Sequence, residues 1–342
     1  MASIINLIRL WFLVSLAVAR RVFRRLLLGP TLPSWTWRTD VTVAVARTAI
    51  EFAATVPDDP LINRFGIHVR APVPPDLHGK VRVSRRRLGS LPADTYLRLG
   101  DATDAATILY FHGGGYVFGN PGTHRQHVAR LVHNTGTTAV APVYRLAPLE
   151  PFPAALDDAI TAYRSLLGTG MSPDSIVVSG DSAGGGLALA LLLSLVELGL
   201  PMPAGAVLFS PYTDLEHTSF TIETNAATDY LPINELQIPN RFYTGPENLS
   251  NPLVSPVYAD LTGLPPLLVL AGGAEMILDD STRLIANAKR DGVDATFHVA
   301  DEMVHVWPAI VPWEPASTEA LDVVSGWISS LYGGATSTVS ED

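Results

Sequence analysis

The chain contains no cysteine, which excludes disulfides, thiolate catalysis and cysteine-based metal sites. Its nine histidines are scattered and form no H-E-x-x-H pattern, so we expect no catalytic metal. The nearest histidine pair, His124 and His127, lies in a polar segment and is expected to face solvent or a cap. Positive charge is also scarce, and the net charge of −10 argues against nucleic acid as the main partner.

The N-terminus lacks an uninterrupted apolar run of membrane-spanning length. The run 10–19 is bounded by Arg9 and Arg20 and is shorter than the roughly 20 residues that a spanning helix needs. Residues 17–19 have the small-x-small form of a signal cleavage site, but no basic cluster precedes them and four arginines follow. We therefore expect a cytoplasmic protein rather than a secreted one.

The same N-terminal segment predicts an amphipathic helix. At about 100° per residue, Arg9, Arg20 and Arg24 fall on one side and leave a wide apolar face. Two interpretations stay open. The helix packs on the domain or covers its ligand site, or residues 1–28 make peripheral contact with a membrane, with the arginines among the headgroups.

What is present is enough for a large core, because 47 % of the 342 residues are hydrophobic. From about residue 80 to 330, short apolar β-rich runs alternate with longer helical stretches. This alternation predicts an α/β fold with a mostly parallel central sheet and helices on both faces. The strands are expected within 80–89, 94–100, 106–114, 137–145, 175–182, 204–211, 265–273 and 295–301, and the helices within 124–136, 153–170, 183–199, 279–292 and 317–332.

Two regions depart from the alternation and are candidates for a cap over the strand ends, where open α/β sheets bind ligands. The expected organisation is therefore a sequence of five parts. These are an N-terminal cap segment 1–75, a first core part 76–212, a cap insertion 213–260, a second core part 261–333 and a flexible tail 334–342.

A candidate nucleophile stands in the stretch "VVSGDSAGG". Gly180-x-Ser182-x-Gly184 follows an expected strand and precedes an expected helix, which is the context of a nucleophile elbow. The serine needs a sharp turn so that its hydroxyl stands clear of the sheet, and the small flanking residues let strand and helix approach closely. The bare pattern occurs by chance, but its strand–turn–helix setting favours a nucleophile over an ordinary serine in a glycine-rich helix cap.

Three consecutive glycines, Gly113, Gly114 and Gly115, follow an earlier strand. A serine that attacks an ester creates an oxyanion, which needs backbone N–H donors that no side chain obstructs. The glycine loop can supply such donors, and the N–H of Ala183, directly after the nucleophile, is the other expected one. We therefore assign an oxyanion hole to these four residues.

These motifs together resemble the hormone-sensitive-lipase family of α/β-hydrolases, the bacterial family IV esterases. The matching stretches are collinear: "HGGGYVFGNPGTHR" (112–125), "PVYRLAP" (142–148), "PFPAALDDA" (151–159), "GDSAGG" (180–185) and "HVWP" (305–308). The resemblance implies an α/β-hydrolase core with a helical cap, hydrolysis of short- to medium-chain carboxylic esters, a small-molecule substrate and no cofactor. A homodimer is a further expectation from the family, although no residue here demands one.

The chain order Ser…acid…His of this fold selects the other two members of a triad. His305, just after the last strand, resembles the catalytic histidine of the family. The family's Asp-Pro-Leu is absent, and aligning "EMI" on it places Glu275 in the acid position. Asp279 and Asp280, a turn later, remain alternatives; their other interpretation is that they cap the start of a helix.

Aromatic and polar residues near these motifs are candidates for substrate binding: Tyr116, Asp181 and Tyr212. Asp181 alternatively orders the turn before the nucleophile. Three competing functions are also retained: a lactone, carbamate or amide hydrolase with the same triad, a membrane-surface lipase, and a non-catalytic ligand receptor. The receptor is disfavoured because receptors that resemble this family have lost the histidine.

Overall fold

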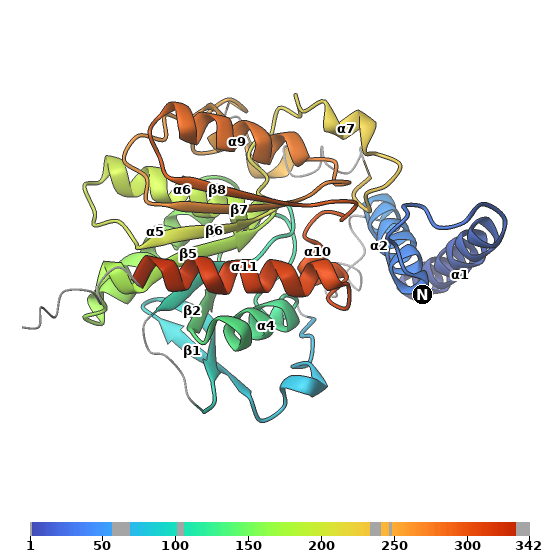
Figure 1. Cartoon of the computed structure of the whole chain (residues 1–342), viewed down its shortest axis with the longest axis horizontal. Coiled ribbons are helices and arrows are strands. Elements are labelled where there is room, and N and C mark those ends of the chain that lie inside the picture. Colours follow the sequence, from blue (N-terminus) through green and yellow to red (C-terminus); the bar gives the residue numbers. More distant parts are fainter. Residues whose placement is uncertain (1, 57–68, 101–105, 233–240, 246–247, 333–342) are drawn as a thin grey trace, which may run out of the picture.

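A computed structural model describes residues 2–56, 69–100, 106–232, 241–245 and 248–332 (Figure 1). One sheet of eight strands runs through it in the order β1-β2-β4-β3-β5-β6-β7-β8. β1 and β2 pair antiparallel, as do β2 and β4, and every other neighbouring pair is parallel. The strands are β1 (Val81–Leu88), β2 (Leu91–Arg98), β3 (Thr107–Phe111), β4 (Thr138–Pro142), β5 (Ile176–Asp181), β6 (Gly205–Phe209), β7 (Leu267–Gly272) and β8 (Ala295–Ala300).

The predicted α/β class is confirmed, and the sequence explains why. Every residue of β3, β5, β6 and β7 is buried, as expected for parallel strands covered on both faces. The helices are α1 (Ala2–Leu28), α2 (Trp37–Thr55), α4 (Arg125–Thr135), α5 (Ala154–Gly168), α6 (Ala183–Glu197), α7 (Thr221–Thr224), α9 (Leu278–Arg290), α10 (Trp307–Ile310) and α11 (Pro315–Tyr332), with 3-10 turns η1 (Pro75–Leu77), η2 (Pro173–Ser175) and η4 (Pro256–Tyr258).

Helices cover both faces of the sheet. Figure 1 shows α5, α6 and α9 on one face and α4 and α11 on the other. Each face has its own apolar core: Leu187 and Leu284 belong to the first, and Val132 and Val324 to the second. The buried strands between the two cores bring their carboxyl ends to one edge of the sheet, which is where the candidate site is expected.

Two parts of the chain lie outside these layers. One is the α1–α2 hairpin at one end of the molecule, and the other is the connection between β6 and β7, which includes α7 (Figure 1). The hairpin is attached near the sheet edge, because the Trp35 indole donates to the Glu302 carbonyl at 2.6 Å and the Thr36 hydroxyl to the Glu314 carboxylate at 2.7 Å. A role of both parts as a cap stays a prediction, and the tail 334–342 lies outside the described residues.

Helix α1 extends well beyond the apolar run 10–19 at both ends. Ser3–Leu28 is long and apolar enough to cross a membrane by length and composition alone. A signal sequence near the N-terminus has the same length and apolar composition. No part of the apolar stretch of this helix is buried inside the protein, so the helix presents its apolar side chains to the surroundings.

Candidate active site

Ser182 stands at a sharp turn between β5 and α6. Its φ is +53°, a left-handed backbone conformation that a residue with a side chain adopts only where the surroundings hold it. Its N–H donates to the Phe209 carbonyl at 2.9 Å, and its carbonyl accepts the N–H of Tyr212 at 3.0 Å. The neighbouring strand β6 and the residues after it therefore hold the turn, and Ser182 is only partly buried at its apex.

Glycine is required on both sides of this turn. A Cβ on Gly180 would overlap the backbone of Gly184, and one on Gly184 would overlap the Phe111 carbonyl at the end of β3. The two glycines thus let the first turn of α6 pass directly over the strand ends. This is the close approach of strand and helix that the sequence predicts.

His305 and Glu275 meet at the same edge of the sheet. Glu275 follows β7 and His305 follows β8, and their Nδ1 and Oε2 atoms are 3.5 Å apart. Both side chains are almost completely buried. The outer ring nitrogen of His305, Nε2, has no hydrogen-bond partner among the described residues, and neither has the second carboxylate oxygen of Glu275. A buried imidazole with an unpaired nitrogen is unusual unless that nitrogen has a chemical task.

Two residues that the sequence did not single out hold this pair. The Ser210 hydroxyl donates to Glu275 Oε2 and accepts the Val306 N–H at 3.0 Å, so it joins the acid to the histidine loop. The buried Asp229 carboxylate accepts the N–H of Met276 at 2.8 Å and that of His305 at 3.3 Å. Ser210 directly follows β6, and this position at the sheet edge is the signal that could have revealed it.

The acids determine the charge of the imidazole. Burial by itself would lower the pKa of His305, but Glu275, and after it Asp229, raise that pKa above its usual value. Asp229 shows the reverse balance, because burial raises its pKa to about 6 although His305 opposes the shift. The two carboxyl groups therefore stabilise a proton on the ring, which is what a general base needs once it has accepted one.

The glycine loop lies beside the elbow, but one predicted donor is already in use. The Gly113 N–H donates to Asp181 Oδ1 at 3.0 Å, so Gly113 is not available to an oxyanion and its assignment is corrected. The N–H groups of Gly114 and Gly115 form no hydrogen bond within the described part of the chain, and both residues are partly exposed. Gly114 has a φ of +121°, which favours glycine at this position.

Asp181 has a supporting position rather than the substrate-binding one predicted. Its side chain is buried, Oδ1 accepts the Tyr110 hydroxyl as well as the Gly113 N–H, and Oδ2 lies 3.2 Å from His124 Nε2. Burial alone would raise the pKa of Asp181, but the charge of His124 holds it well below its usual range. With both oxygens engaged inside the protein, Asp181 orders the glycine loop.

The expectation that His124 and His127 face solvent or a cap was wrong. His127 is buried against Phe209 and Tyr110, and burial lowers its pKa to about 4. His124 pairs with Asp181, which raises its pKa although burial opposes this. The polar residues around His124 and His127 in the sequence gave no indication that both side chains pack behind the glycine loop.

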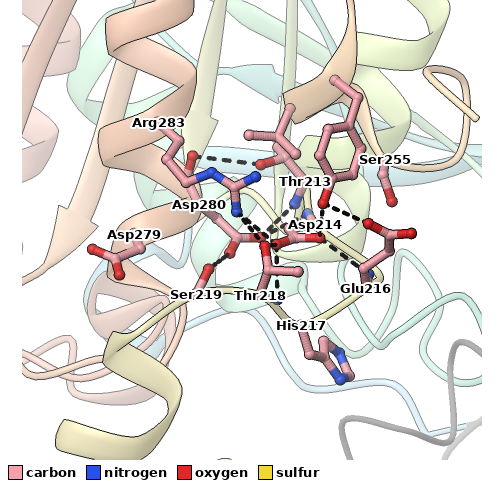
Figure 2. A network of polar contacts seen from close by, with 12 residues as sticks. Thr213, Asp214, Glu216, His217, Thr218, Ser219, Ser255, Asp279, Asp280 and Arg283 are labelled. Atoms are coloured by element: carbon pink, nitrogen blue, oxygen red, sulfur yellow. Dashed lines mark hydrogen bonds and ion pairs between the residues drawn. The ribbon is translucent and has the colours of Figure 1, made fainter. Parts of the chain in front are cut away.

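The alternative acids Asp279 and Asp280 lie in the first turn of α9, and Asp280 belongs to a different network. Asp280 Oδ2 accepts the N–H groups of Thr213 and Asp214 at 2.8 and 2.9 Å, and Oδ1 accepts the Ser219 hydroxyl at 2.6 Å (Figure 2). Asp279 points away from this network in Figure 2. Among the three acids, Glu275 is therefore the one paired with His305.

The two predicted aromatic contacts are packed inside the protein. The Tyr116 ring stacks on Tyr243 at 3.8 Å, and the Tyr212 hydroxyl is hydrogen-bonded to His217. Each tyrosine is only 2 % exposed, so substrate contact by either ring stays a prediction. Among the described residues, no group of three histidine or acidic side chains is arranged to hold a metal ion.

Comparison with known proteins gives consistent matches. The alpha/beta hydrolase fold family matches residues 108–309. An acetyl-hydrolase of Streptomyces hygroscopicus is 39 % identical over 67 % of this chain and 77 % of its own length, and an esterase of Acinetobacter venetianus is 37 % identical over the same shares.

Solved structures agree with these relatives. EstE5, in crystals soaked with p-nitrophenyl butyrate, has a TM-score of 0.76 and 35 % identity, covering 85 % of this chain and 99 % of that chain. An esterase of the bacterial hormone-sensitive lipase family has a TM-score of 0.73 and 34 % identity, covering 94 % and 97 %.

Proposed function

Because the chain belongs to the hormone-sensitive-lipase family of α/β-hydrolases and is a carboxylic ester hydrolase, we propose that Ser182, His305 and Glu275 form its catalytic triad. The observation that carries the proposal is the buried His305–Glu275 pair at 3.5 Å, with the second ring nitrogen unpartnered. It lies at the strand edge where the backbone of Ser182 is held in a left-handed turn. An acid, an oriented base and a serine hydroxyl at one edge of the sheet are the parts that acyl transfer requires.

In the first step, Oγ of Ser182 attacks the ester carbonyl carbon while its proton passes to Nε2 of His305. The carbonyl π electrons move to the oxygen and form a tetrahedral oxyanion. Collapse of this intermediate expels the alkoxide, which takes the proton from His305, and leaves an acyl group on Ser182. Water then repeats the sequence: it gives its proton to His305, attacks the acyl carbon, and releases the carboxylic acid as Ser182 regains its proton.

Backbone donors stabilise the oxyanion in both halves of the reaction. We assign this role to the N–H groups of Gly114, Gly115 and Ala183. The first two belong to the loop that Asp181 orders through Gly113, and the third begins helix α6, whose N-terminal dipole adds a favourable field. Removing one donor of this kind typically costs about 3–4 kcal/mol of transition-state stabilisation.

The substrate is a small-molecule ester, and we propose that short to medium acyl chains are preferred. A lactone, carbamate or amide would need the same three residues, so these substrates are outcomes of the test rather than separate sites. A non-catalytic receptor is no longer an alternative, because the chain is an enzyme. A homodimer, a cytoplasmic location and a cap built from 1–75 and 213–260 stay predictions.

The test is hydrolysis of p-nitrophenyl esters from acetate to palmitate, with labelling of Ser182 by a fluorophosphonate probe. Maximum kcat/KM on short or medium chains, with label on Ser182 only, is the expected result. Label on Ser182 without ester turnover would move the substrate to a lactone, carbamate or amide. Ester turnover with no label on Ser182 would contradict the triad.

A further inference from the structure

Helix α1 carries an apolar stripe along the side that faces away from α2. At about 100° per residue, its large side chains fall within an arc of roughly 120° that contains no charged residue. All are 62–73 % exposed, although they are large and apolar. We call the set the α1 stripe: Ile4, Ile8, Trp11, Phe12, Phe23 and Leu26.

The opposite side of α1 is attached to the protein. Arg21 and Arg25 of α1 both pair with Asp40 of α2, the former at 3.3 Å, and Arg9 lies over the Phe52 ring of α2. α2 in turn is attached near the sheet edge through its N-terminal residues. α1 is therefore the outermost element at this end of the molecule (Figure 1), and the side chains of its stripe are exposed.

A cationic cleft lies on the opposite side of α1 from the stripe, between α1, α2 and residues 227–228. Its volume is about 490 Å³, and four guanidinium groups line it: Arg20, Arg21, Arg24 and Arg47. Burial, together with the nearby charges of Arg24 and Arg47, lowers the pKa of Arg21 although Asp40 opposes the shift. Like charges gathered in one cleft favour an added anion.

The negative charges around the cleft are too few to neutralise it. Asp40 is shared with Arg25, which does not line the cleft, and Arg47 lies 3.5 Å from the half-exposed Glu51. Arg20 and Arg24 form no ion pair with any carboxylate in the described part of the chain. No residue of the catalytic cluster lines the cleft, so it is a separate site.

We propose that the α1–α2 hairpin docks on an anionic phospholipid bilayer, with the α1 stripe in the acyl boundary and the arginines along its edge, Arg9, Arg20 and Arg24, among the lipid phosphates. Planar guanidinium groups bind phosphate through paired hydrogen bonds. Apolar side chains on one helix face with arginines along its edge are the composition of a helix that lies in the interface.

Charge favours a lipid surface over a second copy of this chain. The whole chain carries −10, yet α1 contains five arginines and no acidic residue. An anionic bilayer offers this helix both opposite charge and an apolar layer. A spanning orientation is disfavoured because Arg9, Arg20 and Arg24 follow one edge of the helix over most of its length.

The hairpin is connected to the reaction site through the cleft. Residues 227 and 228 of the cleft directly precede Asp229, whose carboxylate accepts the N–H of His305. Apolar esters concentrate in bilayers, so a docked enzyme would meet them there. Docking itself is independent of catalysis, and vesicle binding therefore tests it whether or not the proposed triad is correct.

The experiment is flotation of the full-length protein with phosphatidylcholine vesicles, with and without phosphatidylglycerol. Wild type is expected to prefer the anionic vesicles, and raised salt is expected to weaken this preference. Leu26→Glu, in the stripe, is expected to weaken binding to both vesicle types at least tenfold. The pair Arg20→Glu and Arg24→Glu is expected to remove only the anionic preference.

Matched exposed positions elsewhere supply the controls. Leu149 is even more exposed than Leu26, and Arg86 and Arg87 lie on the exposed part of edge strand β1. Leu149→Glu and the pair Arg86→Glu and Arg87→Glu are expected to bind like wild type. All variants should hydrolyse a soluble p-nitrophenyl ester normally, which verifies folding, because none of these residues belongs to the catalytic cluster.

Three results would overturn the proposal. The first is the absence of wild-type binding to anionic vesicles, and the second is an equal loss of binding in the control variants. The third is that wild type does not bind vesicles but self-associates, as measured by light scattering, and that Leu26→Glu abolishes this self-association. That result would make the stripe a protein interface. Inorganic phosphate and chloride are compared, at equal ionic strength, for their ability to displace the protein from anionic vesicles. Equal displacement supports lipid phosphates as the bound anion. Much stronger displacement by phosphate would assign the cationic cleft to free phosphate.

Discussion

Two clusters of buried carboxyl groups flank the β7–α9 connection and differ in how their oxygens are engaged. In the first, which we call the reaction cluster, Glu275 faces His305 and is joined by Ser210 and Asp229. The second, the anchor cluster, is the network of Asp280 in Figure 2, which holds the chain that leaves β6. Glu275 and Asp280 are both completely buried, so burial alone does not distinguish them.

Their hydrogen bonds do distinguish them. Asp280 accepts three hydrogen bonds, and Asp214 beside it pairs with Arg283 at 2.6 Å, so this network is satisfied within the fold. In the reaction cluster, one oxygen of Glu275 and both ring nitrogens of His305 have no hydrogen-bond partner among the described residues. Of these two carboxyl clusters, the saturated one is therefore expected to serve the fold, and the unsaturated one is available for chemistry.

The largest effect is expected from Ser182→Ala, because it removes the attacking hydroxyl. We expect kcat to fall by a factor on the order of 10⁴–10⁶ with an unchanged melting temperature. The matched control is Ser179→Ala on the preceding strand β5, whose hydroxyl is buried and has no hydrogen-bond partner within the described part of the chain. A similar loss in both variants would mean that the damage is structural.

The next effect separates the clusters directly. Glu275→Gln keeps the size of the side chain but removes the charge that holds the imidazolium, so kcat is expected to fall on the order of 10³–10⁴-fold. Asp279→Asn, in the first turn of α9 and partly buried, is expected to stay within a few fold of wild type. The reverse ranking in steady-state kinetics would move the acid out of the reaction cluster.

Asp280→Ala should reverse that pattern, with loss of stability and little loss of chemistry. It leaves buried donors of Thr213, Asp214 and Ser219 unpaired, and we expect a loss of about 2–4 kcal/mol in the free energy of unfolding. Urea unfolding measures the loss, and kcat per folded molecule should stay within tenfold. An unchanged unfolding midpoint with abolished activity would place Asp280 in the reaction.

Asp280→Asn is the control for charge. Burial raises the pKa of Asp280 to about 7, so the folded protein keeps this carboxyl protonated where the unfolded chain, with an ordinary pKa of about 4, releases the proton. The stability that wild type owes to this proton is lost as the pH rises between these two values. Relative to the asparagine variant, wild type should therefore become less stable over that range.

The smallest effect is expected from Asp229→Asn. The negative charge of Asp229 helps to raise the pKa of His305, so its removal should shift the acid limb of kcat/KM to lower pH. Asparagine can still accept the N–H of Met276, and we expect less than a tenfold change in kcat at neutral pH. A pH–rate profile measures the shift, and Asp158→Asn, a buried acid paired with Arg145, should leave the profile unchanged.

The sequence predicted the parts of the site that depend on backbone geometry. The Gly-x-Ser-x-Gly turn and the glycine loop are recognisable in the sequence, because a tight turn and a backbone without side chains require particular residues. Asp181 and the histidines 124 and 127 were misjudged for the opposite reason. Their tasks arise from contacts between β3, β5 and α4, which lie far apart in the chain.

By itself, the sequence determined the α/β class and the position of the Gly-x-Ser-x-Gly turn, because apolar periodicity and glycine placement are local constraints. Only the tertiary structure paired His305 with Glu275 rather than Asp280, placed Ser210 and Asp229 beside this pair, engaged the Gly113 N–H with Asp181 and left the α1 stripe exposed. Any carboxylate can serve as an acid or as an anchor. Which task it has depends on the donors that distant strands bring to it, and these are set when the chain packs.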